Sequence, residues 1–168
     1  AYNAATSVFP SNLDPAQTAQ ASIGQYDVRS TALQTAMVSA AIANNGTLMA
    51  PYLIAEALAP DLDPLRITEP EEQSDAVSRQ TARELTEMMV EVVDSGTGTN
   101  AAIAGVSVAG KTGTAERGPQ DPPIYWLTSF APAESPEVAV AVVIEDAGDE
   151  LDISGGRLAA PVARAVMQ

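Results

Sequence analysis

The chain of 168 residues contains no cysteine and no histidine. Zinc sites are built mainly from thiolate and imidazole ligands, so a zinc centre of the usual kind is excluded for this chain. A Cys–His pair or a Ser–His–Asp triad within the chain is excluded for the same reason. We expect neither a metal ion nor a cofactor here.

Basic side chains are also scarce: 8 lysine and arginine residues stand against 22 aspartate and glutamate residues, which gives a net charge of −14. Such a charge repels phosphate backbones and anionic lipid surfaces, so we expect no nucleic-acid partner. Lysine occurs only once, at Lys111, and every other basic residue is an arginine. A lysine that occurs once, between glycines and threonines, is a candidate catalytic or binding residue.

Long hydrophobic runs are missing too. The longest, residues 138–144, has the length of a strand and is far too short to span a membrane. The chain length suits one domain with a sizeable core. The sequence opens at Ala1 without a signal segment, and we interpret residues 1–168 as a portion of a single domain.

Capping residues and apolar spacing predict three helices. Thr31 and Gln34 form a capping box at the start of the first helix, which Asn45-Gly46 ends. Ser78 caps the second helix, which ends at residues 96–99, and the third runs from about Gly156 to Met167. The expected packing face of the first helix consists of Leu33, Met37, Ala40, Ala41 and Asn44. That of the second consists of Ala82, Leu85, Met89, Val92 and Val93.

In the C-terminal half, the spacing of the apolar residues changes from the period of helices to the period of strands. Strands are predicted over residues 106–116, 125–130 and 138–144, and their short connections favour antiparallel neighbours. Residues 1–21 carry turn signals and are expected to be irregular, while residues 60–75, rich in proline and acid, are expected to form a solvated loop. The predicted fold class is α+β, with an antiparallel sheet flanked by helices.

The stretch from Val108 to Ala115 places Lys111 at the centre of a strand. Gly113 removes a side chain beside the lysine, so that the backbone of another molecule could lie against the strand. Thr112 and Thr114 flank this glycine, and each offers a hydroxyl and a backbone N–H. Such an edge can hold an anionic peptide through one cation, a hydroxyl and main-chain pairing. The plainer interpretation is a strand whose lysine points into water.

Two other kinds of site can be weighed against the sequence. Residues 105–112 match the glycine, four residues, Gly-Lys-Thr pattern of a phosphate-binding loop. That loop must open a helix, whereas these residues are strand-like and are followed by Gly113-Thr114. The acidic run of residues 145–152 could hold calcium, but it lacks the regular oxygen spacing of a helix–loop–helix site, so we favour a solvated turn.

Taken in order, these residues resemble the C-terminal half of a penicillin-binding protein transpeptidase domain of the class B, high-molecular-weight kind. The resemblance rests on Lys111-Thr112-Gly113-Thr114, with Ala109-Gly110 before it and Ala115 after it. The supporting motifs are Ile23-Gly24-Gln25, Thr31-Ala32-Leu33-Gln34, residues 41–46, Gly96-Thr97-Gly98-Thr99, residues 126–132, and Gly155-Gly156 with residues 159–162. The resemblance implies the α+β fold that these enzymes share with serine β-lactamases.

The resemblance also implies an activity: a serine attacks the D-Ala-D-Ala stem peptide of peptidoglycan, and the acyl group then passes to an amine of a neighbouring strand. β-Lactam antibiotics would acylate the same serine. Lys111 would support the substrate and a proton network, and Thr114 would bind the terminal carboxylate. The backbone N–H just beyond Gly113 would be an oxyanion-hole donor. The substrate would bind along the strand formed by Thr112, Gly113, Thr114 and Ala115.

Two motifs of that family do not occur in this sequence. No Ser-x-x-Lys is possible, because Val108 stands three residues before Lys111, and no serine begins a Ser-x-Asn. We therefore expect a companion polypeptide to carry the nucleophilic serine, and this chain alone to be inactive. The implied location is the extracytoplasmic face of the bacterial membrane, with an N-terminal anchor outside this chain and the cell-wall synthesis machinery as partner.

Two further hypotheses remain open at this point. The chain could belong to a non-catalytic module that binds β-lactams or peptidoglycan. It could also belong to a serine β-lactamase or D,D-carboxypeptidase, since these enzymes share the Lys-Thr-Gly strand. The helix after Gln25 and the strand from Trp126 favour the transpeptidase.

Overall fold

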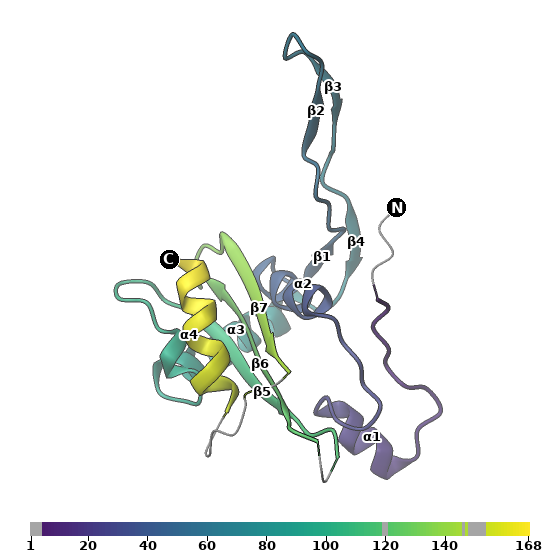
Figure 1. Ribbon diagram of the computed structural model, residues 1–168, viewed down its shortest axis with the longest axis vertical. Coiled ribbons are helices and arrows are strands. Elements are labelled where there is room, and N and C mark those ends of the chain that lie inside the picture. Colours follow the sequence, from purple (N-terminus) through teal and green to yellow (C-terminus); the bar gives the residue numbers. More distant parts are fainter. Residues whose placement is uncertain (1–4, 119–120, 146, 148–153) are drawn as a thin grey trace.

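A three-stranded antiparallel sheet forms the centre of the computed structural model, which describes residues 5–118, 121–145, 147 and 154–168. Its strands are β5 (Ala109–Ala115), β6 (Ile124–Ala131) and β7 (Val138–Ile144), in the order β5-β6-β7 (Figure 1). Lys111 lies opposite Thr128, and Gly113 lies opposite Trp126. The antiparallel sheet and the α+β class are confirmed.

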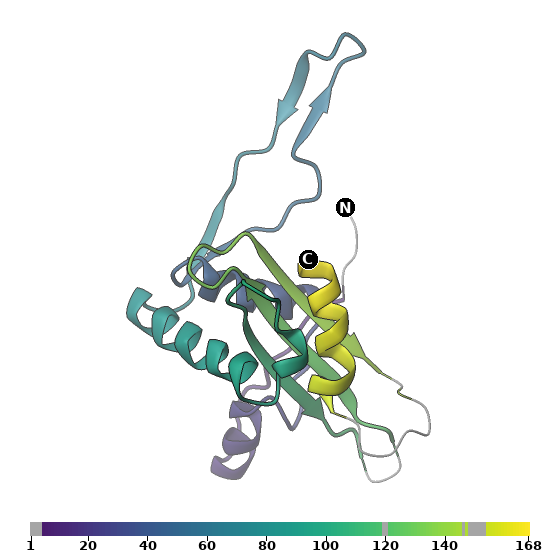
Figure 2. The same cartoon turned by 90° about the vertical axis from the view of Figure 1, so that its left-hand side faces the viewer.

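Helices cover both faces of this sheet (Figure 2). Helix α4 (Gly155–Met167) lies on one face, and helix α2 (Ala32–Ala43) lies on the other, against β6 and β7. Helix α3 (Arg79–Asp94) packs along β5 and is followed by a short 3-10 helix, η1 (Thr99–Ala101).

Each face of the sheet has its own core. The α4 side buries Val108, Leu127, Val140 and the alanines Ala159, Ala160 and Ala163. The opposite side buries Met89, Ala109 and Phe130. Alanines on α4 let the helix axis approach the sheet closely, because small side chains leave little separation between the backbones.

The N-terminal boundary of α2 is as expected, but its capping pattern and its buried face differ from the prediction. The Thr31 hydroxyl accepts the Gln34 backbone N–H at 3.1 Å, so the cap is confirmed. The other half of the predicted capping box, in which the Gln34 side chain accepts the Thr31 backbone N–H, is wrong. That N–H donates instead to the Ser7 hydroxyl. Leu33, Ala40 and Asn44 of the expected face are exposed, while Ala41 of that face is buried as expected. Ser39, which was not assigned to this face, is buried as well. Ser39 is accommodated there because its hydroxyl pairs with that of Thr128 on β6 at 2.6 Å.

The expectation of an irregular segment over residues 1–21 is wrong for its last part. Helix α1 (Pro15–Ser22) forms there. Asp14 caps it and accepts the Gln17 backbone N–H at 2.8 Å, while the Gln17 side chain accepts the Asp14 N–H at 3.0 Å. Pro15 occupies a first-turn position, where its missing N–H costs nothing.

The segment between α2 and α3 is a projecting β-arm, not the solvated loop expected over residues 60–75. Strand β1 (Thr47–Met49) pairs with β4 (Glu72–Asp75) at its base, and β2 (Glu56–Leu58) pairs with β3 (Pro64–Ile67) farther out. The β2–β3 hairpin stands clear of the body in both ribbon views (Figures 1 and 2). Every residue of β2, β3 and β4 is exposed.

The strand expected over residues 106–116 begins later than predicted. Regular pairing starts at Ala109, and Val106 instead forms an isolated bridge with Ile103. The other two strands and the two remaining helices fall within a few residues of their expected bounds.

Candidate active site

The candidate site lies on β5, at the edge of the sheet. Side chains alternate along the strand, so Lys111 and Gly113 lie on one face while Thr112 and Thr114 lie on the other. The face of Lys111 is that of α2, because Thr128 opposite it contacts Ser39 and the Thr35 carbonyl of that helix. The two threonines therefore share the α4 face.

The backbone groups of β5 also alternate, between β6 and the open edge. A Cβ atom placed on Gly155 would lie 2.4 Å from the Trp126 carbonyl oxygen and 2.7 Å from the Gly113 carbonyl oxygen. Both oxygens can approach one point this closely only if they lie between the strands, so Gly113 and Trp126 form a hydrogen-bonded pair. The N–H and C=O groups of Thr112 and Thr114 consequently point away from β6, to the open edge.

Two side-chain donors already contact this open edge. The Lys111 ammonium group donates to the Thr112 carbonyl oxygen. The Gln25 side-chain amide, from the loop after α1, donates to the Thr114 carbonyl oxygen at 3.3 Å. Lys111 and Thr114 are themselves exposed. A cation, a hydroxyl and outward-facing backbone groups thus gather within a few residues.

On the α4 face of β5, the Thr112 hydroxyl contacts the segment that follows α3. It pairs with the Thr97 hydroxyl at 2.6 Å. Behind Thr97 lies Gly156 at the start of α4, whose carbonyl accepts the Asn100 side-chain amide at 2.9 Å. A Cβ on Gly156 would lie only 1.9 Å from the Thr97 carbonyl oxygen. Glycine is therefore required for this close contact between α4 and the site.

The structure brings together all the residues proposed from the sequence, since Lys111, Thr112, Gly113, Thr114 and Ala115 all belong to β5. Sequence reasoning missed Gln25 and Thr97 as parts of the site. Both stand in motifs that contributed to the family resemblance, yet nothing local indicates that they reach β5. Their contacts join residues 89 and 15 positions apart.

The alternative sites find no support in the described residues. Lys111 lies inside a strand, and no helix begins after it, so the geometry of a phosphate-binding loop is missing. Among residues 5–118, 121–145, 147 and 154–168, no group of three or more acidic residues is placed to hold a metal ion. The acidic run of residues 145–152 lies mostly outside the described residues. In the same part of the chain, none of the helices has the length and apolar character needed to cross a membrane.

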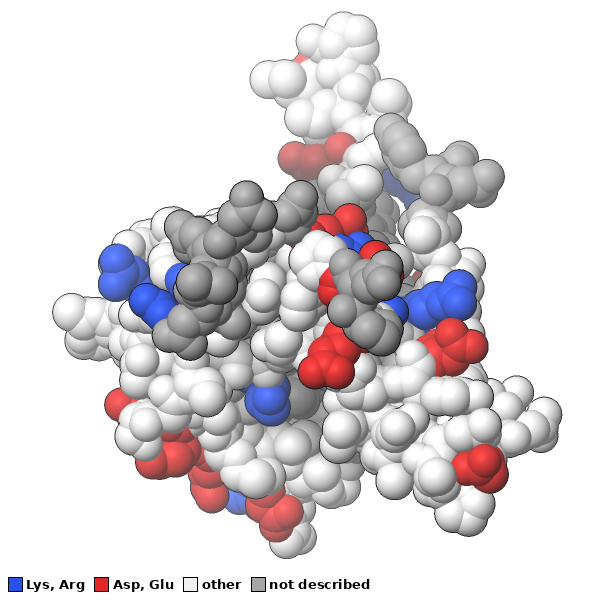
Figure 3. Space-filling model, turned by 60° about the horizontal axis from the view of Figure 1, so that its bottom comes forward, with Lys and Arg blue, Asp and Glu red and all other residues white. Residues whose placement is uncertain are grey.

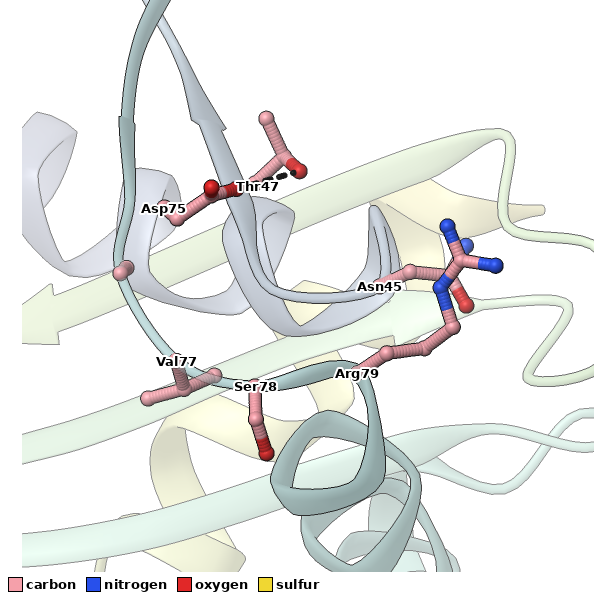
Figure 4. A pocket seen from close by; sticks show the side chains of 7 residues that line it. Asn45, Thr47, Asp75, Val77, Ser78 and Arg79 are labelled. Carbon is pink, nitrogen blue, oxygen red and sulfur yellow. Dashed lines mark hydrogen bonds between the residues drawn. The ribbon is translucent and has the colours of Figure 1, made fainter.

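One pocket of the described chain lies away from β5, at the base of the β-arm. It is open, has a volume of about 500 Å³, and is lined by residues that include Asn45, Asp75 and Arg79 (Figure 4). The end of the molecule at which β5 finishes shows a largely uncharged described surface with scattered acidic and basic groups (Figure 3). This pocket shares no lining residue with β5, so the candidate site is defined by the open edge of the strand.

Sequence comparison links the chain to bacterial transpeptidases. The family model of the penicillin binding protein transpeptidase domain matches residues 5–168. Peptidoglycan D,D-transpeptidase PbpA of Mycolicibacterium smegmatis is 49% identical over 158 residues, which cover 92% of this chain and 32% of that protein. The PbpA of Mycobacterium tuberculosis is 47% identical over 160 residues, with the same coverage of each chain. The chain thus spans about a third of the length of these relatives.

Solved structures give the same answer for the fold. Penicillin-binding protein A from M. tuberculosis, as a ceftriaxone acyl-enzyme complex, superposes with a TM-score of 0.89 at 45% identity. That match covers 96% of this chain and 37% of the other. Its imipenem acyl-enzyme complex gives a TM-score of 0.86 at the same identity, over 96% of this chain and 36% of the other. With the open strand edge and the family match together, the chain belongs to the penicillin-binding protein transpeptidase domain family.

Proposed function

We propose that this chain supplies the Lys-Thr-Gly-Thr strand of a peptidoglycan D,D-transpeptidase. The observation that carries the proposal is the open edge of β5: the N–H and C=O of Thr114 point outward there, and the Lys111 ammonium group contacts the outward carbonyl of Thr112 on the same edge. In this reaction a serine oxygen attacks the D-Ala-D-Ala carbonyl carbon, the C–N bond breaks, and D-alanine leaves with the proton. An amine of a second stem peptide then attacks the serine ester, which forms the cross-link and returns the proton to the serine.

Each residue of the strand has a role in this proposal. The Thr114 backbone N–H faces the open edge and donates to the oxygen that becomes negative in the transition state. The Thr114 hydroxyl binds the terminal carboxylate, and Thr112 lines the same face. Lys111 supplies positive charge for the substrate and for the proton network of the serine. Gly113 and Ala115 keep the strand surface flat for a peptide or a β-lactam.

The serine itself is not a residue of this strand, and neither Ser-x-x-Lys nor Ser-x-Asn occurs in the sequence. The proposal therefore includes a companion portion that carries the nucleophile, and it takes this chain alone to be inactive. It places the complete protein at the extracytoplasmic face of the bacterial membrane, acting with the cell-wall synthesis machinery. The names of the PbpA relatives support the transpeptidase over the β-lactamase and the binding-module alternatives.

The test of this function is an intact-mass spectrum of the complete protein before and after incubation with penicillin G. We expect the polypeptide that contains the serine to gain the full mass of the drug, because an acyl-enzyme retains every atom of an opened β-lactam ring. The isolated chain of residues 1–168 should gain no mass. A stable adduct together with release of D-alanine in the presence of an amine acceptor identifies a transpeptidase. Rapid loss of the adduct to water identifies a β-lactamase, and no adduct identifies a binding module.

The Thr97–Thr112 hydroxyl pair gives a prediction about the support of the strand. Thr97→Val keeps the shape of the side chain but removes its hydroxyl, so the Thr112 hydroxyl loses the partner that orients it. One such hydrogen bond is worth ~1 kcal/mol, which corresponds to about a fivefold lower acylation rate constant of the complete protein. The measurement is the second-order rate of acylation by a chromogenic or fluorescent β-lactam.

Thr99→Val is the matched control, because Thr99 is an exposed threonine of the same segment. It should leave the rate within twofold of the original. Combining Thr97→Val with Thr112→Val should cost little more than Thr112→Val alone, since both changes remove the same bond. Additive effects of the two changes would show that the pair is not coupled.

A further inference from the structure

The loop between α1 and α2 presents Gln25 to the open edge of β5. Two neighbours, Gly24 and Tyr26, have left-handed backbone conformations with φ of 78° and 61°. A non-glycine residue in this region is strained, and such strain is often found at functional sites. Ile23 and Tyr26 are 78% and 50% exposed, whereas Gln25 between them is partly buried. The loop thus directs one polar side chain onto the strand and the flanking apolar ones into solvent.

The acceptor that Gln25 contacts is one that a pairing peptide needs. The Thr114 carbonyl points to the open edge, and the Gln25 amide nitrogen lies 3.3 Å from its oxygen. A peptide that adds to an open strand edge donates its own backbone N–H groups to such carbonyls. Thr114 is exposed, so no other element in the described chain fills this place in the strand edge.

We propose that Gln25 is an internal competitor of the acyl donor: its side-chain amide occupies the Thr114 carbonyl until an amide N–H of the donor replaces it. This inference rests on the proposed function of β5. Before the donor binds, the bond satisfies an edge carbonyl that would otherwise attract a foreign strand. When the acyl donor binds, its N–H···O bond to Thr114 replaces that of Gln25. Gln25 therefore lowers the acylation rate of those acyl donors that bind through the Thr114 carbonyl.

The competition predicts discrimination between two kinds of β-lactam. Penicillin G carries an acylamino group, and in this proposal its N–H competes for the Thr114 carbonyl as the N–H of a pairing peptide does. Imipenem carries a hydroxyethyl group in its place and has no amide N–H there. Both drugs are named in acyl-enzyme structures of the M. tuberculosis relative. Removal of the Gln25 donor should therefore favour penicillin G alone.

The experiment uses the complete protein with Gln25→Ala and measures the second-order acylation rate for each drug. We expect the penicillin G rate to rise about two- to tenfold, the equivalent of one neutral hydrogen bond, while the imipenem rate stays within twofold. Gln25→Met keeps the length of the side chain without its donor and should give the same result. Ile23→Ala, in the same loop, should leave the ratio of the two rates unchanged.

Each of the following outcomes would overturn the proposal that Gln25 competes with the acyl donor. If both rates fall together, Gln25 positions β5; if penicillin G alone becomes slower, Gln25 assists the donor. If neither rate changes, the bond has no bearing on acylation. A rise with Gln25→Ala but not with Gln25→Met would attribute the effect to volume. If the unaltered protein reacts with neither drug, the proposed function fails, and that result is distinct from all of these.

Discussion

Lys111→Ala is expected to lower the acylation rate constant of the complete protein by ~10²–10³-fold, the usual cost of removing one preorganised group that stabilises transition-state charge. Lys111 is the only lysine of the chain, is exposed, and lies at the open edge of β5. Because its side chain is not part of either core, the melting temperature should change little. Stopped-flow acylation and thermal unfolding of the same sample measure both effects.

Arg83→Ala is the matched control for this change. It removes one positive charge from an exposed position of α3 and so changes the net charge by the same amount. If the role of Lys111 is local, Arg83→Ala should leave acylation unchanged, and Lys111→Arg should recover only part of the loss, because the guanidinium group is larger and planar. An acylation rate of Lys111→Ala within threefold of the original would refute the role given to the lysine.

The second large effect is expected at Gly156, where the added methyl group of Gly156→Ala has no room. Its Cβ would lie 1.9 Å from the Thr97 carbonyl oxygen, and a backbone atom cannot move aside as the end of a flexible side chain can. Alanine gains up to ~1 kcal/mol over glycine in helix propensity, but overpacking typically costs ~1–3 kcal/mol and is at its largest against backbone. We expect the clash to prevail and to move α4 away from the Thr97 segment.

The measurement is thermal unfolding of the complete protein, where a net loss of up to ~2 kcal/mol lowers the melting temperature by at most roughly 4–8 °C, the shift of a 150–250-residue domain. Gly113→Ala provides a graded comparison, because its Cβ would meet only the Trp126 Cβ atom, at 3.3 Å. It should cost clearly less stability. If Gly156→Ala were as stable as the unaltered protein, the close contact between α4 and residue 97 would not exist in solution.

The sequence predicted best those elements that bury one face. The second helix has Ala82, Met89 and Val93 buried at helical spacing, as its pattern indicated. The arm between Ala50 and Glu71 was missed because its strands are exposed throughout, so no alternation of apolar and polar residues marks them. Helix α1 was missed for a different reason: the turn signals of residues 1–21 include Asp14-Pro15, and the same pair is a helix start signal.

The candidate site divides in the same way. The strand residues Lys111 and Thr114 could be proposed because they are adjacent in a short motif. Gln25 and Thr97 could not, because a hydrogen bond between distant segments depends on the completed fold and leaves no period or spacing in the sequence. Even the face of α2 was misjudged at Ser39, since a buried hydroxyl is acceptable only when a partner such as Thr128 is known.

The projecting arm has a consequence for how the chain tolerates changes in length. Thr47 and Asp75 are paired neighbours, so the polypeptide leaves the body and returns to it at adjacent points. The residues between this pair form a loop whose two ends are fixed next to each other. Doubling the length of such a loop costs only ~0.6 kcal/mol in closure entropy. Insertions, deletions or a grafted peptide at the hairpin tip, residues 59–63, can therefore be accommodated while β5 and its neighbours keep their register.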